Sequence, residues 1–300
     1  MHSISQIVAN SIQRLSTARP GYAVAALALY VVSLFIVGAR WRGFLRALGG
    51  EVGLVRSTLA TLGGIAAGNL TPASRVGGEA CRIGLVRLGG RATWQQAAIA
   101  AVWDRLSELP PIIVLGAMAL VAVRHLASGW RTVSIVIGLV AALIVGGVAI
   151  ARLRPSGFAL GACSRFSDTL LAGWRDSLAL HEVTGRVFAE GVGYSVLLWL
   201  QDVARLTCVA LAFGVALSPT KIAMLSMLAM LGGLVPAVAG LGPVEGSLVA
   251  GLMAFGVDLP TAAAVTALER VISYGVSTSA GAVVIALLGG RSVWSAARGR

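Results

Sequence analysis

One charged pattern occurs twice in this chain, once in each half, within sequence that is otherwise apolar. Each copy has a Gly-rich or Pro-rich break, then an acidic residue, and about 25 residues later an acid followed directly by an arginine. The two copies are Glu79 with Asp104-Arg105, and Glu245 with Glu269-Arg270. Breaks in hydrophobic segments that recur at matching places in two halves are a sequence signature of transporter binding sites.

The composition is that of a membrane protein. Hydrophobic residues make up 57% of the 300 residues and charged residues only 12%, whereas a soluble domain carries about 25% charged residues. Three stretches, 21–39, 131–151 and 275–288, are long and carry no charge apart from Arg131 at the start of the second, which is typical of helices that cross a bilayer. We therefore expect a multi-pass protein of the bacterial cytoplasmic (inner) membrane.

The hydrophobic pattern predicts an all-α polytopic fold. Five long helices are expected, over 21–39, 95–123, 131–151, 187–216 and 261–288. Two further units, 50–90 and 218–256, each combine a helix, a break formed by prolines and glycines, such as Gly77 and Gly78 in the first unit, and a short helix. Because the short arm from Glu79 to Gly89 cannot cross a bilayer core of ~30 Å, each unit is predicted to be a re-entrant or broken-helix hairpin.

Arginine accounts for all but one of the 24 basic residues, and its distribution orients the chain. If each hairpin leaves on the side that it enters, fifteen arginines fall on one side and five basic residues on the other. The first side, which holds 40–56, 82–94, 152–186 and the C-terminus, is therefore predicted to be cytoplasmic. One hairpin then enters from the cytoplasm and the other from outside, which makes the two repeats inverted.

The domain boundaries follow from this topology. We expect an N-terminal interfacial helix or tail over 1–20, a first membrane repeat over 21–151, a cytoplasmic connector over 152–186, a second membrane repeat over 187–290 and a cytoplasmic tail over 291–300. The connector mixes arginines with Asp168, Asp176 and Glu182, and no second soluble domain is expected.

Several classes of site lack the residues that they need. The net charge of +12 is explained by arginines in loops between hydrophobic runs, so no nucleic-acid partner is expected. Cys81, Cys163 and Cys208 have no metal-binding spacing, and the sequence contains no phosphate-binding GxxxxGKS/T loop for nucleotide-driven transport. We therefore expect neither a metal nor a cofactor.

Two arginines inside long apolar helices are the main candidates for substrate binding. Arg105 and Arg270 each follow an acid, Asp104 and Glu269, and a charge at the bilayer centre is costly unless it is paired or hydrated. One interpretation is that the guanidinium groups bind the phosphate of a lipid head group through two oxygens at once. The other is that each arginine simply pairs with an acid on a neighbouring helix.

Polar residues around the breaks extend this candidate site. Glu79 and Glu245 are predicted to open the short helices, where a carboxylate either complements the helix dipole or serves as a partner for the arginines or a proton carrier. Arg75 and Asn69 lie in the first break and either contact a head group or satisfy freed carbonyl groups. Arg82, three residues after Glu79, completes the set of candidate substrate-binding residues.

The long helices contain further charged residues beside the two acid–arginine pairs. Asp202 and Arg205 are three residues apart, so a local ion pair within one helix is the simpler interpretation. Glu108 lies one turn after Asp104, just before two prolines where the helix is expected to bend, and is predicted to face the same cavity.

At these residues the chain resembles a known family. The order N-x-T-P-x4-G-G-E-x2-R, then D-R about 25 residues later, then L-G-P-V-E-G and E-R, is similar to the lysylphosphatidylglycerol synthase transmembrane region, a flippase-like family, over roughly residues 20–290. This resemblance implies a membrane protein that moves a lipid between leaflets. In bifunctional members a separate soluble domain transfers the aminoacyl group, and we expect no such activity from this chain.

Three hypotheses follow for the function. The leading one is a flippase that shelters a charged lipid head group in a polar groove between inverted hairpins, because an unsheltered head group would bear the desolvation cost of crossing hydrocarbon. The expected partners are membrane lipids: anionic or aminoacylated phospholipids, glycolipids or hopanoids. The alternatives are an integral membrane enzyme that acts on a lipid phosphate and a non-catalytic partner in an envelope-lipid pathway.

Overall fold

A computed structural model describes residues 13–14, 16–71, 74–88, 92–123, 183–233 and 242–298, and it contains no strand within these ranges. The helix predicted over 131–151, nearly all of the connector 152–186 and most of the segment 1–20 lie outside the described residues. Backbone contacts divide the chain into two units, Met1–Glu108 with Glu182–Arg300, and Leu109–His181. The candidate site lies within the first unit.

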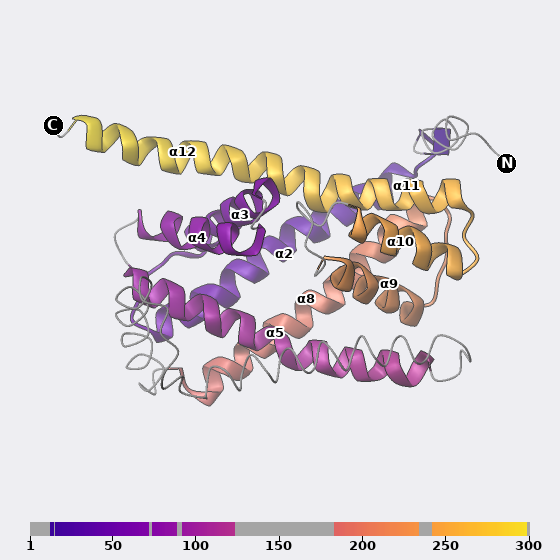
Figure 1. Cartoon of the computed structure of the whole chain (residues 1–300), viewed down its shortest axis with the longest axis horizontal. Helices are drawn as coiled ribbons and strands as arrows, with labels where there is room; N and C mark the ends of the chain where they lie inside the picture. Colours follow the sequence, from indigo (N-terminus) through magenta and orange to yellow (C-terminus); the bar gives the residue numbers. More distant parts are fainter. Residues whose placement is uncertain are drawn as a thin grey trace, which may run out of the picture. The chain divides into compact units, whose positions relative to one another are not determined.

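The two halves of the chain contain helices in the same order. The first half has α2 (Pro20–Ala47), α3 (Leu54–Leu70), α4 (Ser74–Arg87) and α5 (Trp94–Val123), as Figure 1 shows. The second half has α8 (Gly185–Ala212), α9 (Pro219–Gly232), α10 (Pro243–Ala254), α11 (Leu259–Arg270), the π-helix η2 (Val271–Val276) and α12 (Ser277–Arg298).

One constant interval along the sequence relates the two halves. We call the interval from Asp104 to Glu269 the repeat offset. The first residues of α2, α3 and α5 precede those of α8, α9 and α11, respectively, by this same offset. The repeated charges therefore belong to a repeat of whole helices.

The ends of α2 and α8 are set by the same residue type. Each helix is followed by a glycine in the left-handed region, Gly49 with φ 79° and Gly214 with φ 74°, a conformation that costs glycine least. After Gly49 the N–H of Gly50 donates to the carbonyl of Leu45 at 2.8 Å, and the corresponding bond follows Gly214. The stop signals of these helices therefore recur at the same spacing as their starts.

Among the residues described, three helical runs are long and apolar enough to cross a membrane: Pro20–Ala47, Gly185–Ala212 and Leu259–Gly289. Large apolar side chains on all three face outward, among them Val24, Val32, Leu200 and Leu287. Exposed apolar surface on long helices suits contact with lipid rather than with water. The prediction of an all-helical membrane protein is confirmed.

The equivalent helices α2 and α8 pack along each other in antiparallel directions (Figure 1). Near one end, a Cβ added to Gly191 would collide with the ring of Phe44. Near the other end, the N–H of Arg19 donates to the carbonyl of Ala212 at 2.9 Å. Residue numbers therefore rise along α2 as they fall along the facing side of α8.

Glycines allow α3 and α4 to approach each other closely. A Cβ at Gly78 would lie 2.7 Å from the carbonyl oxygen of Gly64, so the backbones meet at a point without side chains. Gly77 and Gly78 were predicted to break the helix, but they lie inside α4, and this prediction is wrong. With 17 and 14 residues, α3 and α4 are about 25 and 21 Å long, so neither spans a ~30 Å bilayer core alone.

The helices that carry the acid–arginine pairs become irregular just after those pairs. Pro110 and Pro111 lie inside α5, where each removes a backbone hydrogen bond. Directly after Arg270, α11 changes into the π-helix Val271–Val276 before α12 continues. In both halves the acid–arginine pair is therefore followed by a stretch in which the regular α-helical hydrogen bonding is interrupted.

Candidate functional site

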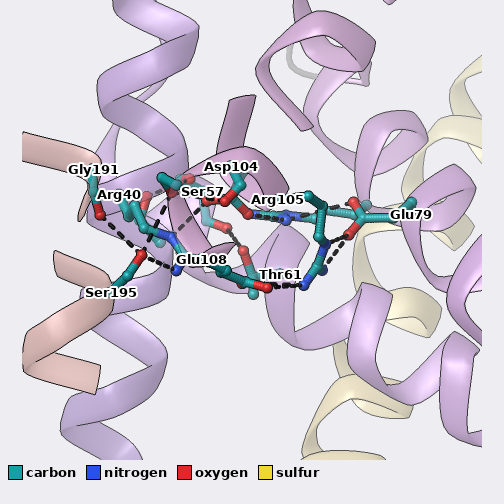
Figure 2. A network of polar contacts seen from close by, with 12 residues as sticks. Arg40, Ser57, Thr61, Glu79, Asp104, Arg105, Glu108, Gly191 and Ser195 are labelled. Atoms are coloured by element: carbon teal, nitrogen blue, oxygen red, sulfur yellow. Dashed lines mark hydrogen bonds and ion pairs between the residues drawn. The ribbon is translucent and has the colours of Figure 1, made fainter. Parts of the chain in front are cut away.

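Six charged side chains from three helices form what we call the first cluster (Figure 2). They are Arg40 on α2, Glu79 and Arg82 on α4, and Asp104, Arg105 and Glu108 on α5. Asp104 is fully buried, and its two oxygens accept hydrogen bonds from Arg40 Nε at 2.7 Å and Arg82 Nη1 at 2.9 Å. Two guanidinium groups offset the cost of burying this carboxylate.

Arg40 joins three helices through its three nitrogens. Besides Asp104, it donates from Nη1 to Ser195 Oγ on α8 at 2.8 Å and from Nη2 to Glu108 Oε1 at 2.5 Å. Its side chain is only 2% exposed, so these partners replace water almost completely. Arg40 therefore fixes the distance between α2, α5 and α8 at the level of the cluster.

Arg82 has donors that the described residues leave unused. Its guanidinium lies 3.9 Å from the ring centre of Trp41, a cation–π geometry, and its side chain is 3% exposed. Nη1 contacts Asp104 and, at 3.5 Å, Glu79, whereas Nε and Nη2 are buried without a hydrogen-bond partner among the described groups. This arginine keeps a capacity to bind an anion.

Arg105 forms the open side of the first cluster. Its Nε donates to Glu79 at 3.1 Å and its Nη1 donates to both oxygens of Glu108 at 3.1 Å, as Figure 2 shows. The side chain of Arg105 is 58% exposed, and those of Glu79 and Glu108 are about one quarter exposed. A ligand thus meets one guanidinium and two carboxylates before it reaches the buried charges.

These side chains face a cavity of about 370 Å³ within the first unit. Its lining combines charged groups with the polar side chain of Asn69, and close glycines on α3 and α4 leave room for it. The charged lining residues are Arg40, Glu79, Arg82, Arg105 and Glu108. This volume lies in the range of small-molecule pockets, and the long helices of the same unit carry apolar outer surfaces.

Five charged residues in the second half form what we call the second cluster: Asp202 and Arg205 on α8, Glu245 on α10, and Glu269 and Arg270 on α11. Arg205 pairs with both Asp202 and Glu269, and its guanidinium lies 5.8 Å from the ring centre of Tyr30. Arg270 Nε donates to Glu245 Oε1 at 2.6 Å. The arginine and the acid of each candidate pair therefore have opposite-charge partners on other helices.

Four residues of the first cluster have a counterpart in the second. The matching residues are Arg40 with Arg205, Asp104 with Glu269, Arg105 with Arg270, and Glu79 with Glu245. In both clusters the acid of the acid–arginine pair binds an arginine on the preceding long helix, and the arginine of the pair binds an acid on the short helix. Two sets of equivalent ion pairs thus occupy equivalent helices.

The structure distinguishes the two acids that were predicted to open short helices. Glu245 lies in the first turn of α10 and accepts a hydrogen bond from the N–H of Gly242 at 2.6 Å, as a dipole-complementing carboxylate does. Glu79 lies in the second turn of α4 because that helix begins at Ser74, so the prediction is wrong for Glu79. Glu79 acts instead as a partner of Arg105.

The remaining predicted residues divide between the cavity and its surroundings. Asn69, near the end of α3, lines the cavity and donates to Thr278 Oγ on α12 at 2.8 Å. Arg75 lies in the first turn of α4. Glu108 lines the cavity, as its spacing predicted, and the local pair of Asp202 with Arg205 is present.

Sequence reasoning missed Arg40, which it counted among the arginines of a cytoplasmic loop. The structure places Arg40 inside α2, buried and ion-paired, so the positive-inside count had misassigned it. Arg82 was counted on the same side and is buried as well. The signal that identifies Arg40 is its separation from Arg205, which equals the repeat offset between the acid–arginine pairs.

The described residues form neither a metal-binding cluster nor a disulfide bond. Across the described ranges, no set of three His, Cys, Asp or Glu side chains is arranged to hold a metal ion. Cys81 and Cys208 are both free thiols. The cavity lining offers guanidinium, carboxylate and amide groups.

The chain belongs to the family described as the lysylphosphatidylglycerol synthase TM region, whose model matches residues 7–281. It is 29% identical over 296 residues to a UPF0104 membrane protein from Methanothermobacter thermautotrophicus, an alignment that covers 92% of this chain and 88% of the relative. It is 24% identical over 294 residues to a UPF0104 membrane protein from Pyrococcus horikoshii, covering 87% and 85% of the two chains. No solved structure matches the chain.

Proposed function

We propose that this protein is a lipid translocase, which moves a charged phospholipid or glycolipid head group between membrane leaflets. The observation that carries the proposal is the cavity of about 370 Å³ lined by ion-paired side chains, inside helices whose outer surfaces are apolar. A charged head group cannot cross hydrocarbon without shelter, because its desolvation is too costly. The cavity would supply that shelter while the acyl chains stay in the bilayer.

The cavity suits a head group that carries a phosphate. Arg105 is its most exposed cation, and Arg82 has two buried donor nitrogens without a described partner. Guanidinium groups bind phosphate through two oxygens at once. Glu79 and Glu108 accept hydrogen bonds from Arg105 and would bind the amino group of a zwitterionic or aminoacylated lipid.

The second element of the proposal is an inverted repeat. Equivalent helices α2 and α8 run antiparallel, and their contacts are reciprocal. Arg40 bonds Ser195, while Arg205 lies over Tyr30, the residue that precedes Ser195 by the repeat offset. Reciprocal contacts of this kind are expected for two units related by a two-fold axis. An axis in the membrane plane makes the repeats inverted, as in many transporters.

The short helices of each half would then form re-entrant hairpins. Their lengths are below the thickness of the bilayer core, and α4 and α10 contribute Glu79, Arg82 and Glu245 to the clusters. Such backbone is tolerated at membrane depth where it is buried in protein or lines a wet cavity. In this arrangement the C-terminus is cytoplasmic, on the arginine-rich side of the membrane.

The decisive experiment is leaflet movement of labelled phospholipids in proteoliposomes that contain the purified protein. Anionic and aminoacylated phospholipids are compared for the native chain, Arg105→Gln and Arg270→Gln. Arg186→Gln is the matched control, because Arg186 is 89% exposed and pairs only locally with Glu190 on α8. All variants are first checked for helix content and monodispersity.

Movement by the native chain and the control, lost in Arg105→Gln, is the expected result. Equal movement in native chain and Arg105→Gln contradicts the cavity as the head-group site. Absence of movement with every lipid tested contradicts the translocase. Release of inorganic phosphate from a lipid diphosphate, without movement, supports the alternative of an integral membrane enzyme.

A further inference from the structure

The two clusters differ in how many arginines hold the buried acid. In the first cluster Asp104 is held by both Arg40 and Arg82. In the second cluster the equivalent acid, Glu269, is held by Arg205, and this arginine is shared with Asp202. One guanidinium in the second cluster thus serves two carboxylates.

The sequence explains the difference. The residue that follows Arg82 by the repeat offset is Ser247, and the next one is Leu248, so neither carries a charge. The residue that precedes Asp202 by the same offset is Val37, so the additional acid is also specific to the second half. Glu108, in turn, is matched by the uncharged Ser273, so each cluster has three acids and the second has one cation fewer than the first.

The other described groups around Glu269 are uncharged or already engaged. The side chain of Glu269 is 8% exposed, and besides Arg205 it meets the hydroxyl of Ser273, while α2 contributes Tyr30, whose hydroxyl donates to the carbonyl of Ser273. On α11 itself the next residue, Arg270, is engaged by Glu245 of α10 and lies 5.2 Å from the ring centre of Tyr274. Three carboxylates thus accompany two guanidinium groups, and of these acids Glu269 is the buried one, whereas Asp202 is 37% exposed.

Two buried acceptors lie one helical turn from these ion pairs. Gln201 Oε1, four residues before Arg205, and Thr266 Oγ, three residues before Glu269, are buried without a hydrogen-bond partner in the described part of the chain. Unsatisfied acceptors of this kind are rare in native structures, because each bears the cost of its desolvation. The surroundings of the second cluster thus hold polar groups whose hydrogen-bonding capacity the described residues do not use.

We propose that Asp202 and Glu269 hold one proton between them at neutral pH, so that the second cluster is a proton-binding site. Two carboxylates that share one cation cannot both stay ionised at little cost when one of them, here Glu269, is buried. With one proton the three acids and two arginines of the second cluster balance, as three acids and three arginines already balance in the first. The proton belongs to the pair rather than to either residue.

Infrared spectroscopy of the full chain tests this assignment without any transport measurement. The carbonyl stretch of a protonated carboxylic acid is followed while the pH is raised, in native protein, Asp202→Asn and Glu269→Gln. The native protein is expected to show this band at neutral pH, and both variants are expected to lose it, because each leaves one acid for Arg205. Glu190→Gln, which removes an exposed acid of α8, should keep the band.

A native spectrum without the band at neutral pH overturns the proposal, as does a band that persists in both variants. If the variants do not fold, a hydrophobic carbodiimide, which modifies protonated carboxyl groups in apolar surroundings, is applied to the native protein. Mass spectrometry should then find the label on Asp202 or Glu269 at neutral pH, with less label as the pH rises. Label confined to other acids contradicts the proposal, whatever the outcome of the lipid assay.

Discussion

Arg40 on α2 donates a hydrogen bond to Ser195 on α8 at 2.8 Å, and the two residues at the matching positions of the other half, Arg205 and Tyr30, also face each other. Each arginine thus binds an acid in its own half and contacts a side chain of the other half. The same two arginines therefore take part in the ion pairs and in the interface between the halves. A change in either arginine alters both at once.

Removal of the Arg40 charge should destabilise the protein strongly. Arg40→Gln leaves Asp104 buried with one guanidinium fewer, and breaking one partner of a buried ion pair costs about 3–5 kcal/mol. Unfolding by denaturant in detergent micelles measures the loss. Arg186→Gln, on the exposed face of α8, should change the midpoint very little, since exposed pairs contribute little.

A second substitution distinguishes the effect of the Arg40 charge from the effect of its packing against α8. Asp104→Asn together with Arg40→Gln removes both members of the pair, so the double variant should be more stable than Arg40→Gln alone. A double variant less stable than either single one would mean that Arg40 acts mainly through its contacts with α8.

Close approach of α3 and α4 makes Gly78 intolerant of a side chain. In Gly78→Ala the new methyl group would lie 2.7 Å from the carbonyl oxygen of Gly64, so the helices must separate, at a cost of about 1–3 kcal/mol. Gly84→Ala on the same helix is the matched control, because nothing lies within 4 Å of its added Cβ. Equal midpoints of thermal unfolding for the two variants would contradict the packing of this pair.

Sequence patterns predicted the long helices well because their period and length are local properties. The predicted helices 21–39 and 187–216 overlap α2 and α8. The identity of the ion-pair partners was not predictable in this way. Arg40 meets Asp104 across 64 residues, a contact that only tertiary packing creates.

The repeat offset identifies Arg40 as a buried residue, whereas a count of arginines on each side of the membrane does not. A count of arginines per side assigned Arg40 to a loop because it lies near the end of a hydrophobic run. Its counterpart Arg205 lies in the middle of another hydrophobic run, and the shared offset resolves the ambiguity. Re-entry of the hairpins stays a prediction, because helix length alone does not determine depth in the membrane.

Asp258 should give the start of α11 a pH-dependent stability. Its carboxylate accepts hydrogen bonds from the N–H and hydroxyl of Thr261 at 3.2 and 3.1 Å. Desolvation raises the pKa of Asp258, but the hydrogen bonds from Thr261 outweigh it and the net pKa lies below its ordinary value. Because the folded pKa is lowered, this stabilisation is complete above the unfolded value of about 3.9 and is lost as the pH falls through the folded pKa.

Two variants separate the cap from its charge. Asp258→Ala removes the N-cap and should cost about 1 kcal/mol at neutral pH, whereas Asp258→Asn keeps most of the capping interaction. In acid the native chain should lose its advantage over Asp258→Asn, as followed by thermal unfolding. An advantage that persists at the lowest accessible pH would show that Asp258 acts through hydrogen bonding alone.

A proton in the second cluster should couple lipid movement to a pH gradient. Protonation and deprotonation of the Asp202–Glu269 pair change the number of charges that Arg205 must balance, and Arg205 also contacts α2 at the interface of the halves. Changes at this pair should therefore bias the arrangement of the two repeats. Movement of a labelled anionic phospholipid by native protein is expected to differ severalfold between proteoliposomes with and without an imposed pH gradient.

Asp202→Asn provides the test of this coupling, because it leaves Arg205 and Glu269 as a simple ion pair and does not touch the cavity. The variant should still bind phospholipid, and its rate of lipid movement should be the same with and without the gradient. Glu190→Gln on the same helix should respond like the native chain. If Asp202→Asn remains as sensitive to the gradient as native protein, the proton that couples to movement resides elsewhere, and the second cluster serves only to hold α8 against α11.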